Sequence, residues 1–227
     1  MKMRISAPFV WCAALLGLFV SCTIVKNDAA NAKQVSSLDS AFAMSAGDST
    51  FDPAKYAAEI WEPVVIPRVE SLAVDYHTLL AGLRSDEAGT SRTYGYVLNE
   101  ERNRYNFAVK GAVKLLSIDT SSQIGTVSLD MAPFDGKEDC LLIIGPVFRG
   151  SALRDIQNTF TLNDFGNQVE FARLARELNN KVSGLVLKDM DISRHIGAEA
   201  ELLGVFTYDG PGSAIEITPV RLSLRGE

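Results

Sequence analysis

Tyr-Asn-Phe-Ala-Val-Lys-Gly-Ala-Val-Lys-Leu-Leu-Ser, residues 105–117, is the stretch that decides the fold. Tyr105, Phe107 and Val109 occupy alternate positions, and the period of two continues at Val113, Leu115 and Ser117. A period of two is typical of a strand that buries one face, because successive side chains of a strand point to opposite sides. We therefore expect a long strand here, in a chain whose core is a β-sheet.

Two more strands are predicted directly after this one. The first covers 124–131, and the second is the apolar run 140–144, which Gly145-Pro146 ends. Turn-forming residues stand between the strands, at 119–122 and again at 135–136. Because the connections are short, we expect the three strands to form an antiparallel meander.

A helix is expected after the third strand. Its apolar residues recur at spacings of three and four positions from Phe171 to Leu178, which makes one apolar face. Asn163 or Asp164 is the expected N-cap, and Asn179-Asn180 marks the exit.

Two last strands, 200–208 and 215–224, are predicted on either side of the turn Asp209-Gly-Pro-Gly212. The order of three strands, a helix and two strands matches the five-stranded oligonucleotide/oligosaccharide-binding (OB) barrel. We therefore predict an α+β fold with an OB-like β-barrel domain over residues 93–227, in which the helix lies between strands 3 and 4. A different α+β arrangement of the same elements is the alternative.

Residues 51–92 are predicted to form an N-terminal helical segment before the barrel. Asp52-Pro53 suits a helix start, and Pro63 is expected to end that helix. A second helix is expected from Ile66, closed by the polar residues 84–92. Its apolar stripe has helical spacing and consists of Val69, Leu72, Ala73, Tyr76, Leu79, Leu80 and Leu83.

Residues 1–21 have the order of a lipoprotein signal peptide. Basic residues precede an apolar run, 7–20, which is short for a spanning helix but suits a secretory signal. Leu18-Phe-Val-Ser-Cys22 resembles a bacterial lipobox, so we expect lipidation of Cys22 and a membrane anchor through its acyl chains. The alternative is an uncleaved N-terminal membrane helix with an incidental cysteine.

The residues after Cys22 bear on where the protein is held. Thr23 stands where an aspartate would resemble an inner-membrane retention signal, so the outer membrane is favoured over the inner. Residues 22–50 are rich in Ala, Ser, Asn and Asp, and we expect a flexible tether that holds the globular part on the periplasmic side.

The charge of the mature chain argues against nucleic acid as a partner. Removal of residues 1–21 takes away Lys2 and Arg4 and no acidic residue, which leaves 20 basic against 28 acidic residues and a net charge of about −8. Binding to a phosphate backbone needs a clustered positive field, which this balance does not favour.

The sequence carries no recognisable catalytic, cofactor or metal motif. His77 and His195 lie outside any nucleophile or metal-ligand pattern, and no phosphate-binding glycine loop occurs. Cys140 is the one thiol left after Cys12 and Cys22, and we expect it to be a small buried hydrophobe. We therefore expect no enzyme, cofactor or metal; a glycosidase with two carboxylates from distant positions stays open as the alternative.

Eight segments, in the same order along the chain, are similar to those of the DUF2291 family of predicted periplasmic lipoproteins. They are Cys22-Thr-Ile-Val-Lys26, Phe51-Asp-Pro-Ala54, Glu59-Ile-Trp-Glu-Pro63, Ile118-Asp-Thr-Ser-Ser122, Ile144-Gly-Pro-Val-Phe-Arg-Gly150, Ala152-Leu-Arg-Asp155, Asn163-Asp-Phe-Gly-Asn-Gln168 and Ile217-Thr-Pro-Val-Arg221. The resemblance covers nearly the whole mature chain. It implies a cellular location but no reaction, since the family has no established activity. Members are often encoded beside ATP-binding cassette (ABC) transporters for sugars of the ribose type, which implies a possible pathway.

One loop departs from the family pattern. Relatives often carry an aspartate-rich, calcium-like loop where this chain has residues 130–139, and here Met131-Ala-Pro-Phe134 replaces most of the oxygen ligands. Since a calcium ion takes six to eight oxygens, we expect a plain turn.

The polar residues between strand 3 and the helix are the candidate ligand site. Arginines could hold an anion or the face of a sugar, and the acids and amides have the mixture of donors and acceptors that hydroxyl recognition requires. The candidates are Arg149, Gly150, Arg154, Asp155, Asn163, Asp164, Asn167 and Gln168. The competing interpretation is structural: an internal ion pair for Asp155, helix caps for Asn163 or Asp164, and a turn at Gly150.

Two functions from different classes follow. The first is a non-enzymatic binding or accessory module for the uptake of a sugar-like solute by an ABC transporter, which predicts a concave site where Arg149, Arg154 and Asn167 converge. The second is a structural or protein-interaction lipoprotein of the cell envelope, which predicts an exposed apolar patch and internally saturated polar residues.

Overall fold

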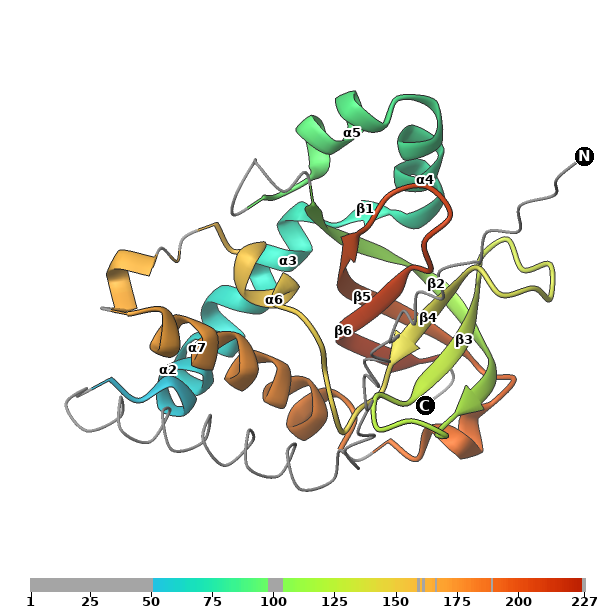
Figure 1. The fold of residues 1–227 in the computed structure, drawn as a ribbon. Coiled ribbons are helices and arrows are strands. Elements are labelled where there is room, and N and C mark those ends of the chain that lie inside the picture. The colour runs from blue at the N-terminus through green and yellow to red at the C-terminus, as the bar shows by residue number, and fades with distance from the viewer. Residues whose placement is uncertain are drawn as a thin grey trace, which may run out of the picture. The chain divides into compact units, whose positions relative to one another are not determined.

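One long strand, β2 (Tyr105–Asp119), organises the sheet in this computed structural model (Figure 1). The structure describes residues 51–97, 104–158, 160, 162–165, 167–188 and 190–225, with the side chains of Leu162 and Asn163 excepted. The expected signal peptide, the lipidation site Cys22 and the tether lie outside these residues. β2 begins at Tyr105, as the alternating stretch predicts, but it runs past Ser117 to Asp119, which was expected in the turn.

β2 has different partners along its two halves. Residues 105–114 pair antiparallel with β5 (Glu199–Tyr208), and residues 113–119 pair antiparallel with β3 (Thr126–Met131). A register shift between Leu115 and Ser117 interrupts the second ladder. Such an irregularity bends a strand and increases its twist, which helps one strand serve two neighbours.

Two further strands close the sheet into a ring. β4 (Cys140–Ile143) pairs antiparallel with β3 and parallel with β6 (Glu216–Leu224), and β6 returns antiparallel to β5. The ring order is therefore β2-β3-β4-β6-β5, with β5 closing on β2. The predicted five-stranded, OB-like barrel is confirmed, and so is the helix between its third and fourth strands.

A sixth, very short strand lies outside the ring. β1 (Val74–Asp75) pairs parallel with Val109 and Lys110 of β2, on the part of β2 that β3 does not reach. Pairing there satisfies backbone groups of β2 that would otherwise face solvent.

The interior of the ring is apolar and closely packed. Phe107 of β2 and Phe206 of β5 are both buried, and their rings stack with centroids 5.6 Å apart. Gly204 stands at a register shift between β5 and β6, where a Cβ atom would lie 2.9 Å from the carbonyl oxygen of Thr218. The chain needs a glycine at this close approach.

The N-terminal segment is helical, as expected, but more finely divided. Asp52 caps the first helix by accepting from the backbone N–H of Ala54 at 3.0 Å. Pro63 does not end the helical path, because a π-helical turn carries it on to the next helix at Ile66. The elements are α2 (Pro53–Ile60), η2 (Trp61–Val65), α3 (Ile66–Leu72), α4 (Tyr76–Ser85) and α5 (Glu87–Tyr94).

Two further predictions for this segment were wrong. The apolar stripe from Val69 to Leu83 is two helices, because strand β1 separates α3 from α4 and Asp75 starts the second by accepting from the N–H of Thr78 at 2.9 Å. The polar stretch 84–92 does not simply close a helix. It contains the start of α5, where Asp86 accepts from the N–H of Gly89 at 2.9 Å.

The connection from β4 to β5 carries the predicted helix, α7 (Gln168–Lys181), which lies beside α2 (Figure 1). The expected caps, Asn163 or Asp164, were wrong: Asn167 caps α7 and its Oδ1 accepts from the N–H of Glu170 at 2.9 Å. The other elements of this connection are α6 (Ala152–Asp155), η4 (Leu162–Phe165), η5 (Val182–Val186) and η6 (Ile192–His195).

Within the described residues, no helix has the length and apolar character that crossing a bilayer demands.

Candidate functional site

Arg154 and Asp155, two of the expected ligand residues, form a buried pair. Arg154 is 8 % exposed, and its Nε donates to Asp155 Oδ1 at 2.7 Å. Its Nη1 donates to the carbonyl oxygen of Phe171 at 3.0 Å, and the guanidinium lies 3.7 Å from the centroid of that ring. Ser151 Oγ donates to the other oxygen of Asp155 at 2.6 Å. These contacts join α6 to α7 with the polar groups turned inward.

Other candidates also take part in local structure. Asn167 caps α7, and Gln168 is the exposed first residue of that helix. Gly150 has φ +79° and its carbonyl oxygen accepts from Asn179 Nδ2 at 3.1 Å. Asp164 is exposed in η4. Asn163 lies in the same turn, and its side chain is outside the described part.

Arg149 has different surroundings from Arg154. It is exposed, and within the described residues no carboxylate pairs with it. With Gly150 it lines a cavity of about 440 Å³, which we call the smaller cavity. Most of the other lining residues come from β4, β5, β6 and the β5–β6 loop, with one from the start of α6 and one just before β2: Ile143, Phe206, Thr207, Asp209, Ser213, Ala214, Glu216, Thr218, Ala152 and Arg104. The structure thus places Arg149 at a cavity and Arg154 inside the packing.

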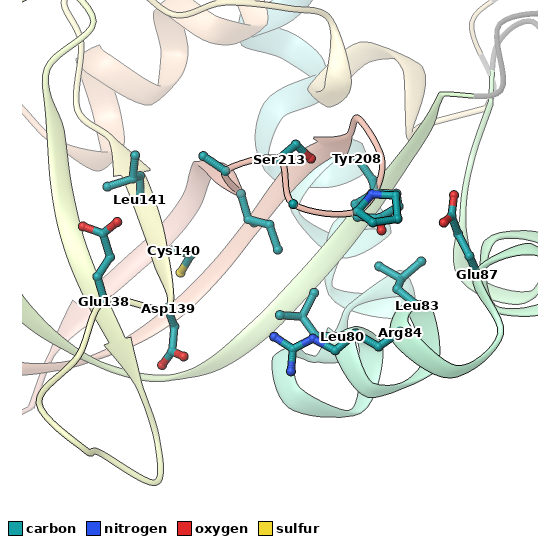
Figure 2. Close-up of a pocket in the computed structure, with 14 residues that line it drawn as sticks. Leu80, Leu83, Arg84, Glu87, Glu138, Asp139, Cys140, Leu141, Tyr208 and Ser213 are labelled. Atoms are coloured by element: carbon teal, nitrogen blue, oxygen red, sulfur yellow. The ribbon is translucent and has the colours of Figure 1, made fainter.

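A second space, of about 580 Å³, lies between α4–α5, the start of β4 and the β5–β6 loop; we call it the larger cavity (Figure 2). Leu80 and Leu83 face it from α4, and Pro211 and Ile215 face it from the loop. Its remaining lining residues are Arg84, Glu87, Glu138, Asp139, Cys140, Leu141, Tyr208, Gly212, Ser213 and Ala214. Its walls are therefore largely apolar, with charged groups among them.

The acidic groups on the β4 side of the larger cavity are held by β3. Glu138 Oε2 accepts from Ser128 Oγ, and Asp139 Oδ2 accepts from the backbone N–H of Met131 at 2.8 Å. Asp130 accepts from the N–H of Gly136 at 2.8 Å. The aspartates of the 130–139 loop thus stabilise its backbone, and Gly136 occupies a turn at φ +82°.

On the helix side, Arg84 and Glu87 have no ion-pair partner within the described residues. Figure 2 shows them on the same wall as Leu83, across from Glu138 and Asp139. Burial raises the pKa of Tyr208, and the nearby Glu87 carboxylate adds to that rise. The cation of Arg84, the anion of Glu87 and the phenol of Tyr208 have no hydrogen-bond partner among the described residues, so a ligand can contact them.

Cys140, which lines the larger cavity, lies beside the buried Tyr76. Tyr76 is fully buried, and its hydroxyl donates to the carbonyl oxygen of Asp139 at 2.7 Å. Burial raises the pKa of the Cys140 thiol to about 12. A thiol with such a pKa stays protonated near neutral pH and is a poor nucleophile. In the part of the chain that the structure describes, no three or more His, Cys, Asp and Glu side chains could hold a metal ion together.

The β5–β6 loop separates the two cavities, and Ser213 and Ala214 line both of them. Sequence reasoning recognised this loop only as a turn and missed the residues across from it on α4 and α5. The available signal was topological, because the loop between the fourth and fifth strands of an OB barrel borders its binding face.

The comparisons with known proteins agree with this fold. The model of the family described as "Predicted periplasmic lipoprotein (DUF2291)" matches residues 12–223. Among curated proteins none matches the chain. A solved OB-fold protein from Thermotoga maritima is similar with a TM-score of 0.63 and 21 % identity, over 78 % of this chain and 100 % of that one. At 21 % identity, this similarity supports the assignment of the fold alone.

Proposed function

This chain belongs to the DUF2291 family of predicted periplasmic lipoproteins, and from that premise we propose that it is a non-enzymatic binding or accessory module for the uptake of a sugar-like solute. The family description implies a lipid anchor, and Cys22 is the residue that would carry it. The ABC transporter as partner and the outer membrane as location are further parts of the proposal.

The larger cavity is the observation that carries the proposal. Its volume of about 580 Å³ is of the size that small-molecule sites have, roughly 300–1,000 Å³. Leu80, Leu83 and Ile215 offer apolar surface of the kind against which the C–H faces of a sugar ring can pack.

The polar groups suit hydroxyl recognition. Arg84 donates in a fixed plane, Glu87 accepts, and the hydroxyl of Tyr208 can do either. Because Arg84 and Glu87 are not paired within the described residues, a ligand could use them without first breaking an ion pair of the protein.

One feature disfavours covalent chemistry in the larger cavity: burial raises the pKa of the Cys140 thiol to about 12, which makes it a poor nucleophile. Glu138 and Asp139 each accept a hydrogen bond from β3 and so help to hold the loop before β4.

The test is a thermal-shift screen of the chain from Thr23 onward, which keeps every described residue, against pentoses, hexoses and sugar phosphates. A ligand at 100 times its Kd should add about 2.7 kcal/mol to the free energy of unfolding. Arg84→Gln should abolish the shift. Arg92→Gln, on the exposed surface of α5 and outside the cavity, is the matched control. Loss of the shift in both variants, or no shift with any sugar, would contradict the proposal.

The alternative, a protein-interaction lipoprotein, has two observations in its favour. Arg154, Asp155 and Asn167 satisfy their polar groups internally, as that function predicts. Leu185 in η5 is in addition 60 % exposed. A folded protein that gives no shift with millimolar sugars, and that crosslinks in the envelope to one partner, would favour this alternative.

A further inference from the structure

The two cavities share part of one wall. Ser213 and Ala214 of the β5–β6 loop line both spaces, so the larger and the smaller cavity meet at this loop. Each cavity alone exceeds the lower end of the range for small-molecule sites, about 300 Å³. Each has therefore room for a ligand unit of its own.

The shared wall is held in place by its own contacts. At the base of the loop, Arg104 Nε donates to Asp209 Oδ1 at 2.6 Å. At its tip, Ser213 Oγ donates to the carbonyl oxygen of Gly210 at 2.6 Å. Gly210 and Gly212 have φ of +100° and +82°, conformations that side-chain-bearing residues rarely adopt. A fixed loop costs a ligand less ordering free energy than a mobile one would.

The smaller cavity differs from the larger in its chemistry. Arg149 and Glu216 are exposed and present opposite charges, while the hydroxyl of Thr207 donates to Asn106 Oδ1 at 2.7 Å and Thr218 is buried. Arg149 has no ion-pair partner within the described residues. This lining favours a polar, hydrogen-bonding unit, whereas the larger cavity combines an apolar wall with Arg84 and Glu87.

We propose that the two cavities are halves of one extended site, so that the preferred ligand is an oligosaccharide of two or more units rather than a free monosaccharide. One unit packs in the larger cavity, the chain crosses the β5–β6 loop at Ser213 and Ala214, and the next unit meets Arg149 and Glu216. This inference rests on the proposed function, because it takes sugar as the ligand class.

The test is isothermal titration of the chain from Thr23 onward with three series: glucose, maltose and maltotriose; xylose, xylobiose and xylotriose; and ribose with its nucleosides. In at least one oligosaccharide series, affinity should rise roughly tenfold or more from one unit to two, the gain expected for one added set of contacts. Arg149→Gln should remove most of that gain, and Ala214→Trp, which fills the crossing point, should remove it entirely. Arg84→Gln should weaken every member of the series.

Circular dichroism of each variant checks that it is folded, and Arg92→Gln is again the control. Equal affinities for one, two and three units, with Arg149→Gln affecting none of them, would overturn the extended site and leave the sugar-binding function standing. Binding of no sugar in any series would overturn both. Preferential binding of nucleosides over sugars would overturn the oligosaccharide as ligand.

Discussion

Two neighbouring regions of the molecule use the same residue type, arginine, in two different roles. Between α6 and α7, Arg154 is buried, lies on the ring of Phe171 and pairs with Asp155. Around the β5–β6 loop, Arg149 and Arg84 line cavities and pair with no carboxylate within the described residues. Arg149 and Arg154 stand only five positions apart in the sequence.

The difference shows that burial and partners, more than residue type, decide what a polar side chain does. A buried charge must be neutralised by its surroundings, because its transfer from water is costly. An exposed charge beside a cavity keeps its water, and it can exchange that water for a ligand. We therefore expect substitutions in the first region to change stability, and substitutions in the second to change binding.

The largest effect should come from Arg154→Ala. This change leaves Asp155 buried without its cation, and we expect the free energy of unfolding to fall by about 3–5 kcal/mol. Urea denaturation measures it. Arg149→Ala is the matched control, with a change within about 0.5 kcal/mol. Equal losses in both variants would erase the distinction between the two regions.

Tyr76→Phe tests a buried hydrogen bond next to the larger cavity. Tyr76 is buried, and loss of its hydroxyl deprives the carbonyl oxygen of Asp139, a residue that lines the cavity, of a donor. We expect a loss of about 1–2 kcal/mol in chemical denaturation. Tyr94→Phe, at a residue 40 % exposed, should have almost no effect. A comparable loss in Tyr94→Phe would show that the buried hydrogen bond is not the cause.

Asn167→Ala tests whether a residue expected to bind ligand is structural. Removal of the cap of α7 should cost about 1 kcal/mol, whereas Asn167→Gly should cost only a few tenths. Thermal denaturation of both variants separates the two outcomes. If Asn167→Ala instead left stability intact and abolished a sugar shift, Asn167 would belong with Arg149 rather than with Arg154.

The smallest effect is a pH dependence at Asp75. The backbone N–H of Thr78 lowers the pKa of the Asp75 carboxyl in the folded protein. Its contribution is therefore present above the ordinary value, about 3.9, and disappears as pH falls through the lowered pKa. After allowance for solvent screening, Asp75→Ala should cost roughly 0.5 kcal/mol at pH 7. The gap between wild type and variant should narrow as the pH falls below the ordinary value and close only below the lowered pKa; a gap that widens would contradict the assigned cause.

The strands were predictable because the alternation of side chains is a local property. The alternating stretch 105–117 marks most of β2, Asp135-Gly136 marks a turn, and Gly145-Pro146 marks the end of β4. Their order along the chain was then enough to select the barrel topology.

Local patterns gave a wrong result where tertiary contacts decide. The apolar stripe from Val69 to Leu83 continues through a break that exists only because Val74 and Asp75 pair with β2. The choice among Asn163, Asp164 and Asn167 as cap depends on where the preceding turn ends.

The candidate site was harder to predict, since its walls come from segments far apart in sequence. Arg84, Asp139 and Ser213 meet at the larger cavity only after the ring has closed. In the polar cluster of the connection, composition could not separate Arg149 from Arg154, because side-chain burial is set by the packing of α6 against α7.

Closure of the ring affects how easily membrane-anchored copies of the protein aggregate. Each of the five barrel strands has a neighbour on both sides, and β1 covers the part of β2 that β3 does not reach. A lipid anchor, as the family description implies, confines many copies to a two-dimensional layer where they collide often. If strand edges were open, the edge strand of one copy could pair with the edge strand of the next, which would start aggregation. Because every barrel strand has a neighbour on both sides, crowding on the membrane carries less of that risk than it would for an open sheet.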